Sequence, residues 1–232
     1  MKTISKNLLF MLFFSNLVFA QYNGNNLSIT TNFNFNTTAK IFLTPNADHV
    51  LDRTNHFPIE DIYSYSIEIR YRVSEFLILG LSAEYMEASA RGRTLTSKQF
   101  VVREGFKLYP IEVSAYYFLP FSTEDFKFYM GGGFGIYTGS RTREFGDIKF
   151  KDVTNEIGYG IQVSIGMDYM IFNNLSAHGE LRFRDPDFKI TNKYNSEFVN
   201  YDDQTFRVSQ DEIVSKINVD GITFGIGLAF HF

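Results

Sequence analysis

Residues 221–232 read GITFGIGLAFHF, and this ending decides the fold. The apolar side chains occupy every second position, namely Ile222, Phe224, Ile226, Leu228, Phe230 and Phe232. Small or polar residues fill the positions between them. Successive side chains of a β-strand point to opposite faces, so this period of two predicts a strand with one apolar face.

The same alternation recurs throughout the chain upstream of this stretch. It is found in residues 27–36, 63–73, 77–85, 111–119, 126–134, 159–169 and 175–184, in addition to 222–232. No segment shows a convincing helical period. We therefore predict an all-β, antiparallel, up-and-down barrel of eight strands.

The connections between these segments alternate in length. Residues 74–76, 120–125 and 172–174 form short turns, whereas the other connections are long and polar, spanning roughly 37–60, 88–105, 139–155 and 185–212. Short turns at one end and long loops at the other are typical of a transmembrane barrel whose two sides differ. An even strand number places both termini at the short-turn end.

Alternation alone does not say which face points outward, because a soluble lipocalin-type barrel would place its apolar face inside. Three features favour an apolar exterior. Aligning the strands sorts the apolar residues into an aliphatic belt between two aromatic bands, as membrane interfaces require. The polar face is rich in glycine, which makes room for large side chains in a narrow lumen. Each apolar segment has about 10 residues, enough to cross hydrocarbon at a tilt.

The N-terminus has the pattern of an export signal. Lys2 and Lys6 precede an apolar stretch, and Val18-Phe19-Ala20 provides small residues for cleavage between Ala20 and Gln21. A retained helical anchor is the alternative, but the stretch has about 13 apolar residues and a spanning helix needs ~20. We expect residues 1–20 to be a signal peptide and residues 21–232 to be a single barrel domain.

These segments resemble the small outer-membrane β-barrels of Gram-negative-type bacteria, of the OmpA-barrel and OmpX kind. The stretches 129–135 (YMGGGFG) and 174–182 (NLSAHGELR) add weakly to the likeness carried by residues 221–232. The resemblance implies an outer-membrane location, with periplasmic termini, lipid as surroundings and a monomer. It also implies an assembly signal, read by the barrel-assembly machinery, formed by Phe224, Ile226, Leu228, Phe230 and Phe232. The chain ends without the periplasmic domain of full-length OmpA, so peptidoglycan binding is not expected.

Composition excludes several classes of function. The chain has no cysteine, which rules out disulfides, thiolate metal sites and a lipidated N-terminal cysteine. Its formal net charge is −4. A mildly acidic protein without a basic stripe is a poor candidate for binding nucleic acid.

Two polar groups invite a catalytic or metal-binding reading. Ser176, His178 and Glu180 share one face of a predicted strand, but residues two apart lie ~6.6 Å apart, too far for an unaided proton relay. The first long loop carries Asp48, His49, Asp52 and His56 at a spacing that fits no strong ligand pattern. We expect neither catalysis nor a metal or cofactor.

The polar face contains both signs of charge. The inward positions predicted to carry them are Glu68, Arg70, Arg72, Glu84, Glu112, Lys127, Glu180, Arg182 and Arg184. Buried charges must be paired, and an eight-stranded barrel is just wide enough for side chains to fill. We therefore expect an ion-pair network that plugs the lumen.

The favoured function is a non-enzymatic surface or envelope protein whose ligand is unknown. A small porin is the alternative, and a lipid-modifying enzyme is a third.

Overall fold

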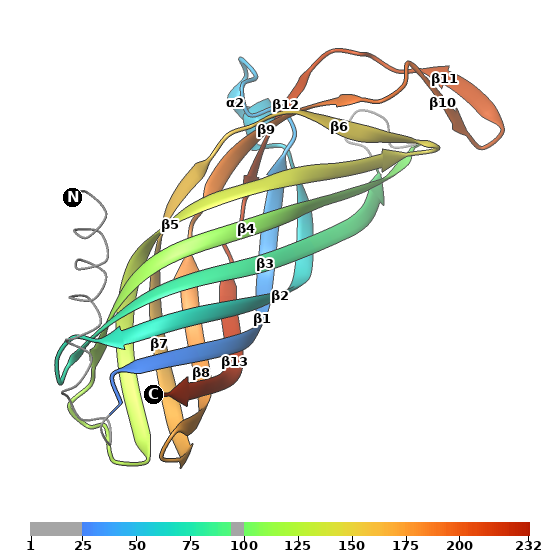
Figure 1. The fold of residues 1–232 in the computed structure, drawn as a ribbon. Helices are drawn as coiled ribbons and strands as arrows, with labels where there is room; N and C mark the ends of the chain where they lie inside the picture. Colours follow the sequence, from blue (N-terminus) through green and yellow to red (C-terminus); the bar gives the residue numbers. More distant parts are fainter. Residues whose placement is uncertain (1–24, 94–99) are drawn as a thin grey trace, which may run out of the picture.

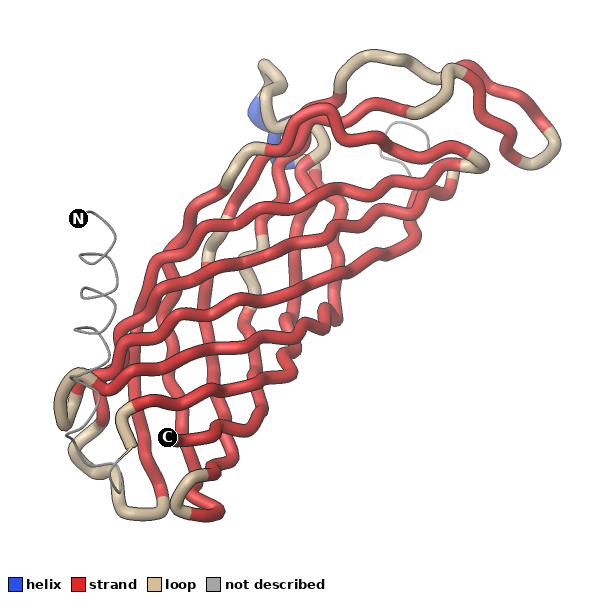
Figure 2. Tube along the Cα trace, in the orientation of Figure 1, coloured by secondary structure: helices blue, strands red, loops and turns tan. Residues whose placement is uncertain are grey.

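The computed structural model describes residues 25–93 and 100–232, and most of them lie in antiparallel strands that curl into a tall barrel (Figure 1, Figure 2). The strands are β1 (Leu27–Phe42), β2 (His56–Arg72), β3 (Leu77–Arg93), β4 (Val101–Phe118), β5 (Phe126–Phe145), β6 (Ile148–Asn155), β7 (Gly158–Phe172), β8 (Leu175–Arg184), β9 (Asp187–Tyr194), β10 (Phe198–Tyr201), β11 (Gln204–Arg207), β12 (Ile213–Asn218) and β13 (Ile222–His231). The predicted signal peptide lies outside the described residues.

The sheet closes on itself near the short turns. Neighbouring pairs run in the order β1–β2–β3–β4–β5–β7–β8–β13, and β13 then pairs with β1 over Asn36↔Thr223 to Ser28↔His231. The backbone amide of Phe232 donates to the Leu27 carbonyl at 2.7 Å, which extends this contact to the last residue. The prediction of an all-β antiparallel barrel is confirmed.

The wall continues far beyond the predicted strands. At the end opposite the short turns, β5 turns into β6, and the pairs β6–β9, β9–β12 and β12–β1 complete the circuit. The count of eight strands is therefore not confirmed, since the described residues contain thirteen, eleven of them in this sheet. The prediction of long polar loops was wrong over much of their length.

Two smaller expectations also need correction or extension. A short helix, α2 (Val50–Thr54), occupies the first loop, where no helix was predicted. No helix of the described residues is long and apolar enough to cross a membrane. The fourth loop contains the separate hairpin β10–β11, seen at the upper right of Figure 1.

The side chains of the wall change environment halfway up. In the lower half the apolar side chains point outward, as predicted: Tyr65, Ile161 and Ile226 are each more than 60% exposed. Inward positions there are polar. In the upper half the apolar side chains turn inward and form a closed core around Ile41, Phe106 and Phe188, while charged side chains point outward. We call this level the inversion level.

Two strands achieve the inversion by a shift in phase. In β1 the buried positions change from Asn34 and Asn36 to Ala39 and Ile41, so even numbers give way to odd ones. The partner strand β2 shifts at the facing position, where Asp61 adopts a left-handed φ of 54°. Other strands keep their phase and change residue type instead. Inward Glu84 of β3 is followed by inward Met86, and outward Tyr85 by outward Glu87.

The upper hairpins have the turn chemistry that tight connections require. Gly146 has a φ of 56° at the first central position between β5 and β6, which suits a two-residue hairpin turn. Asp202 and Asp203 both have positive φ between β10 and β11, a conformation that aspartate tolerates better than most residues. These turns let the chain reverse without disrupting the paired strands.

Closure of the wall leads to a first prediction. A closed sheet has no free edge at which unfolding can begin, and lipid or detergent cannot replace its backbone hydrogen bonds. We expect the folded protein to migrate differently on a detergent gel before and after boiling. Identical mobility of boiled and unboiled samples, after reconstitution verified by circular dichroism, would contradict a closed barrel.

Candidate functional site: the polar lumen and its apolar cap

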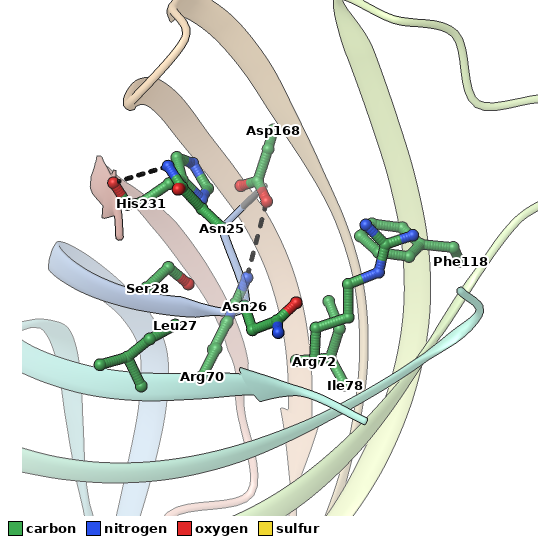
Figure 3. A pocket seen from close by; sticks show the side chains of 10 residues that line it. All are labelled: Asn25, Asn26, Leu27, Ser28, Arg70, Arg72, Ile78, Phe118, Asp168 and His231. Atoms are coloured by element: carbon green, nitrogen blue, oxygen red, sulfur yellow. Dashed lines mark hydrogen bonds and ion pairs between the residues drawn. The ribbon is translucent and has the colours of Figure 1, made fainter. Parts of the chain in front are cut away.

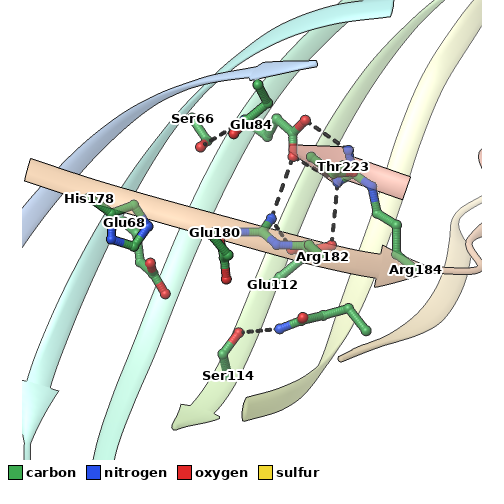
Figure 4. A network of polar contacts seen from close by, with 12 residues as sticks. Ser66, Glu68, Glu84, Glu112, Ser114, His178, Glu180, Arg182, Arg184 and Thr223 are labelled. Atoms are coloured by element: carbon green, nitrogen blue, oxygen red, sulfur yellow. Dashed lines mark hydrogen bonds and ion pairs between the residues drawn. The ribbon is translucent and has the colours of Figure 1, made fainter. Parts of the chain in front are cut away.

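Arg182 of β8 is the centre of the polar lumen (Figure 4). Its guanidinium donates to Glu180 at 2.7 Å and to Glu112 of β4 at 3.0 Å, and it lies 3.8 Å from Glu84 of β3. One cation thus joins carboxylates from three strands across the interior. Because all four side chains are almost fully buried, their contacts are screened little by water.

Arg184 forms a second connection immediately above. It donates to both carboxylate oxygens of Glu84, at 2.7 and 2.9 Å, and to the side-chain oxygen of Asn36 at 2.8 Å. Ser64 donates to the same glutamate. Bidentate hydrogen bonds between an arginine and a carboxylate are among the strongest that side chains make. Arg184 and Ser64 therefore fix the position of the Glu84 carboxylate.

A lower cluster surrounds Arg70 of β2. Its guanidinium donates to Glu68 at 2.7 Å and lies 3.8 Å from Asp168 of β7. The same group stacks on the rings of Tyr116 and Tyr129, at 4.6 and 4.9 Å from their centroids. The fully buried Tyr116 also donates to Glu68. Glu68 is therefore bonded from both sides, and Arg70 fills the space between two aromatic rings.

Most of the predicted interior charges enter these two clusters. The structure brings together Glu68, Arg70, Glu84, Glu112, Glu180, Arg182 and Arg184. Within them, Glu180 has its described ion pair with Arg182. Arg72 donates to the carbonyls of Ser74 and Glu75 at the short-turn end, and Lys127 lies half-buried at the start of β5.

Several members of the network were not assigned to it from the sequence. Asp168 and His178 bond to each other at 2.6 Å, and Tyr137 donates to Glu112 at 2.6 Å. Asp168 and His178 occupy polar-face positions of predicted strands, whereas Tyr137 lies beyond the predicted strand 126–134. In each case the bonding partner belongs to another strand. A further group, Glu104 with Arg141 and Arg143, lies in the upper half, in two segments interpreted as loops, 88–105 and 139–155.

The side chains of the two clusters lie buried inside the lower half of the barrel. A small cavity of about 30 Å³ opens at the short-turn end, where Arg70, Arg72, Asp168 and His231 contribute to its lining (Figure 3). That volume matches about one water molecule. This cavity is far too small to be an aqueous channel through the barrel.

The residues considered for catalysis belong to separate pairs. Ser176 lies 2.9 Å from Nε2 of His231, whereas Nδ1 of His178 bonds to Asp168. Glu180 bonds instead to Arg182. A nucleophile, a base and an orienting acid must form one connected relay, and these contacts do not join the three residues into one.

The four residues considered for a metal site belong to the first loop and the start of β2. Asp48, His49, Asp52 and His56 lie in or around α2, and Nδ1 of His56 bonds to the Thr54 carbonyl. Among residues 25–93 and 100–232 no group of three or more metal-ligating side chains is close enough together to hold an ion.

An apolar core closes the barrel above the network. Its fully buried members include Ile41, Ile59, Phe106, Leu108 and Ile190. Burying each large apolar side chain stabilises the fold by ~1.5–3 kcal/mol. This gain explains why segments that resemble loops become strands, since free loops would leave these residues in water.

A second apolar cluster supports the outermost hairpins. Phe145, Ile148 and Val199 are its buried members along with Val102 and Tyr194. Phe100 packs on this cluster with its ring edge-on to Phe206 at 5.1 Å. We define the platform as β6, the β10–β11 hairpin and the adjoining ends of β4 and β5. The platform is an ordered unit with its own apolar contacts.

Asp147 joins the β10–β11 hairpin to the rest of the platform. Its carboxylate accepts hydrogen bonds from the backbone amide of Asn200 at 2.9 Å and from that residue's side-chain amide at 2.8 Å. These bonds favour the ionised form and lower the pKa of Asp147. The ionised Asp147 therefore stabilises the folded hairpin fully at pH values above the ordinary pKa of an aspartate. This stabilisation is lost as pH falls through the lowered pKa.

The Asp147 contact gives a second prediction. Asp147→Ala should lower the protection of the amides in residues 198–207 at neutral pH, measured as their hydrogen-exchange rate relative to an unstructured chain at the same pH. Strong acidification of the unmodified protein should lower the same protection. Asp48→Ala, a change of the same kind in the first loop, serves as the control. Unchanged exchange in the Asp147 variant would show that the hairpin is held by its apolar contacts alone.

Comparisons with solved structures agree with this architecture. The outer-membrane protein OprG from Pseudomonas aeruginosa superposes with a TM-score of 0.65 at 15% identity, over 90% of this chain and 96% of that one. The outer-membrane protein AlkL gives 0.50 at 15% identity, over 92% and 93%. Neisserial surface protein A gives 0.48 at 15% identity, over 89% and 97%.

Sequence comparisons add no closer relationship. No protein-family model matches the chain, and no curated protein matches it. At the identities seen with the solved structures, the likeness concerns the fold alone. Together with the apolar belt, the aromatic bands and the closed wall, it shows that this chain has the fold of the small outer-membrane β-barrel proteins.

Proposed function

We propose that this protein is a non-conducting, non-enzymatic outer-membrane barrel that carries an interaction platform outside the cell. The observation that supports this proposal most directly is the lumen, where Arg182 joins Glu84, Glu112 and Glu180 across the interior. A diffusion pore needs a continuous water path at this level. The side chains that would line such a path instead bond to one another.

The upper half of the molecule supports the second part of the proposal. A barrel needs strands of only about 10 residues to cross the hydrocarbon, whereas β5 has 20 residues and β4 has 18. The additional length builds the apolar core and the platform. Ordered structure beyond the membrane is what a protein needs to present a fixed surface, and this observation favours contact with molecules outside the cell.

Two measurements test the proposal. In planar bilayers the unmodified protein should show no steady conductance, and a large stable conductance would favour the porin alternative.

In cells lacking other adhesins, replacing residues 198–207 by a short Gly-Ser turn should reduce attachment to polystyrene and to a layer of identical cells. The variant must keep its heat-dependent gel shift. Undiminished attachment would contradict a role for the platform in surface interaction.

A further inference from the structure

A buried group of charged side chains separates the two apolar clusters of the upper half. On β4, Glu104 lies between Phe106 of the apolar core and Val102 of the cluster that supports the platform. Nε and Nη2 of Arg141 both donate to one carboxylate oxygen of Glu104, at 3.1 and 2.9 Å. Nε of Arg143 lies 3.2 Å from the other oxygen. Two cations therefore share one carboxylate, and we call these three residues the upper charge cluster.

The upper charge cluster contains hydrogen-bond donors without acceptors. Arg141 is 2% exposed, and its Nη1 has no hydrogen-bond partner among the described residues. Nε of Arg143 is also buried and makes no hydrogen bond of good geometry, although it lies close to Glu104. A buried donor without an acceptor keeps the full cost of its desolvation, and native structures rarely contain one. These nitrogens therefore point to a partner that the polypeptide does not supply.

Aromatic rings enclose the two guanidinium groups. Cζ of Arg141 lies 4.9 Å from the ring centroid of Phe150, and Cζ of Arg143 lies 5.5 Å from the same centroid and 5.9 Å from that of Tyr194. The face of an aromatic ring attracts a cation, but Nη1 of Arg141 still has no hydrogen bond. The rings and the apolar side chains around them keep water away, so charges inside the cluster are screened little.

The upper charge cluster has a surplus of one positive charge. Two other acids lie nearby along the chain, but Glu144 pairs with Lys149, and exposed Asp152 accepts a hydrogen bond from Asn192. Neither acid has an ion pair with Arg141 or Arg143 within 4.0 Å in the described structure.

Burial also acts on the arginine itself. It lowers the pKa of Arg141, although the charge of Glu104 acts in the opposite direction. One carboxylate thus fails to compensate for two cations in this position, and a buried charge without compensation is costly. A bound anion would remove this cost, whereas a water molecule would satisfy the donor and leave the charge.

From these observations we propose that the upper charge cluster binds one small anion, of the size of chloride, beside Nη1 of Arg141. The anion accepts the unused N–H groups of the two arginines and cancels the surplus charge. A small ion suits the site because Arg141 is buried on all sides. It enters past Arg143, whose side chain is 15% exposed. The inference rests on these buried charges and not on the role proposed for the platform.

Urea unfolding at different chloride concentrations tests the proposal. The protein is folded in neutral lipid vesicles, and sodium gluconate replaces sodium chloride so that the ionic strength stays constant. A ligand that binds only the folded state raises its stability until the site is saturated. Chloride should therefore raise the urea midpoint of the unmodified protein in a saturable way. Arg141→Met should abolish this dependence, because it removes both the surplus charge and the free donor. Glu104→Gln should lower the chloride concentration at half of the effect, because it increases the surplus.

Arg103→Gln is the matched control. Arg103 is exposed and precedes Glu104 on β4, so its loss should leave the chloride dependence unchanged. An equal dependence in the unmodified protein and in the Arg141→Met variant would overturn the proposal.

A measurement on the unmodified protein does not depend on whether the variants fold. In crystals soaked in sodium bromide, anomalous scattering should place a bromide ion within hydrogen-bonding distance of Nη1 of Arg141. Water alone at that position would overturn the proposal, because it would show that the surplus charge is tolerated without an anion.

Discussion

Arg182→Ala should lower the stability of the barrel more than any exposed charge change. The substitution removes the ion-pair partner described for Glu180 and one of the partners of Glu112 and Glu84, and all three glutamates are buried. Removing one member of a buried charge cluster typically costs ~3–5 kcal/mol, because the remaining charges keep their desolvation cost and lose their attraction. Urea unfolding in neutral lipid vesicles should show a correspondingly lower midpoint.

Arg207→Ala is the matched control for this experiment. Arg207 also pairs with a glutamate, Glu197, at 2.6 Å, but its side chain is 76% exposed. Exposed pairs contribute ~0–1 kcal/mol, so the midpoint should barely move. If the two variants unfold at the same urea concentration, the Arg182 cluster is hydrated enough that burial does not govern its energy.

Gly166→Ala should also destabilise the protein, for a reason of packing. A Cβ at this position would overlap the hydroxyl group and ring of Tyr129. The tyrosine is fully buried and stacks against His178, with ring centroids 6.0 Å apart, so it has little room to move. Overpacking a filled interior typically costs ~1–3 kcal/mol. The same urea titration should show the loss.

Gly179 offers a close control on the neighbouring strand. It pairs with Met167, one residue along from Gly166, and a Cβ there meets nothing within 4 Å. Gly179→Ala should therefore leave the midpoint unchanged or raise it slightly, since alanine restricts the unfolded chain. A similar loss in both variants would indicate an intrinsic requirement for glycine in these strands and not a clash with Tyr129.

The lower half of the fold is predictable because its alternating residues always place the apolar side chains outward and the polar side chains inward. Between Tyr63 and Tyr71, for example, each apolar residue faces outward and each polar residue inward, so period and polarity agree. The upper half uses the same period with the opposite polarity. Ile41, Phe57 and Ile59 are as apolar as the belt residues, yet they belong inside because the surroundings at their height are aqueous. When the segments that contain these residues are considered without the strands below them, they resemble polar loops with scattered apolar residues.

The lumen could be predicted as a set of charges but not as a set of bonds. The pairs Glu68–Arg70 and Glu180–Arg182 are two residues apart on one strand, so the sequence alone places them together. Contacts such as Arg182–Glu112 span β8 and β4, which are not neighbours in the sheet. Their formation depends on barrel closure, strand register and side-chain reach, and local alternation carries none of that information.

The inversion level has a mechanical consequence for the molecule. Displacing the barrel inward by one residue pair would carry outward Glu87, Lys107 and Asp187 toward hydrocarbon. A charged side chain on the lipid face costs ~0–1 kcal/mol near the interface, and the cost grows with depth. Displacing it outward would lift aliphatic side chains into water. The free energy thus rises in both directions. The membrane therefore fixes the depth of the barrel, and the platform lies at a constant height above the lipid surface.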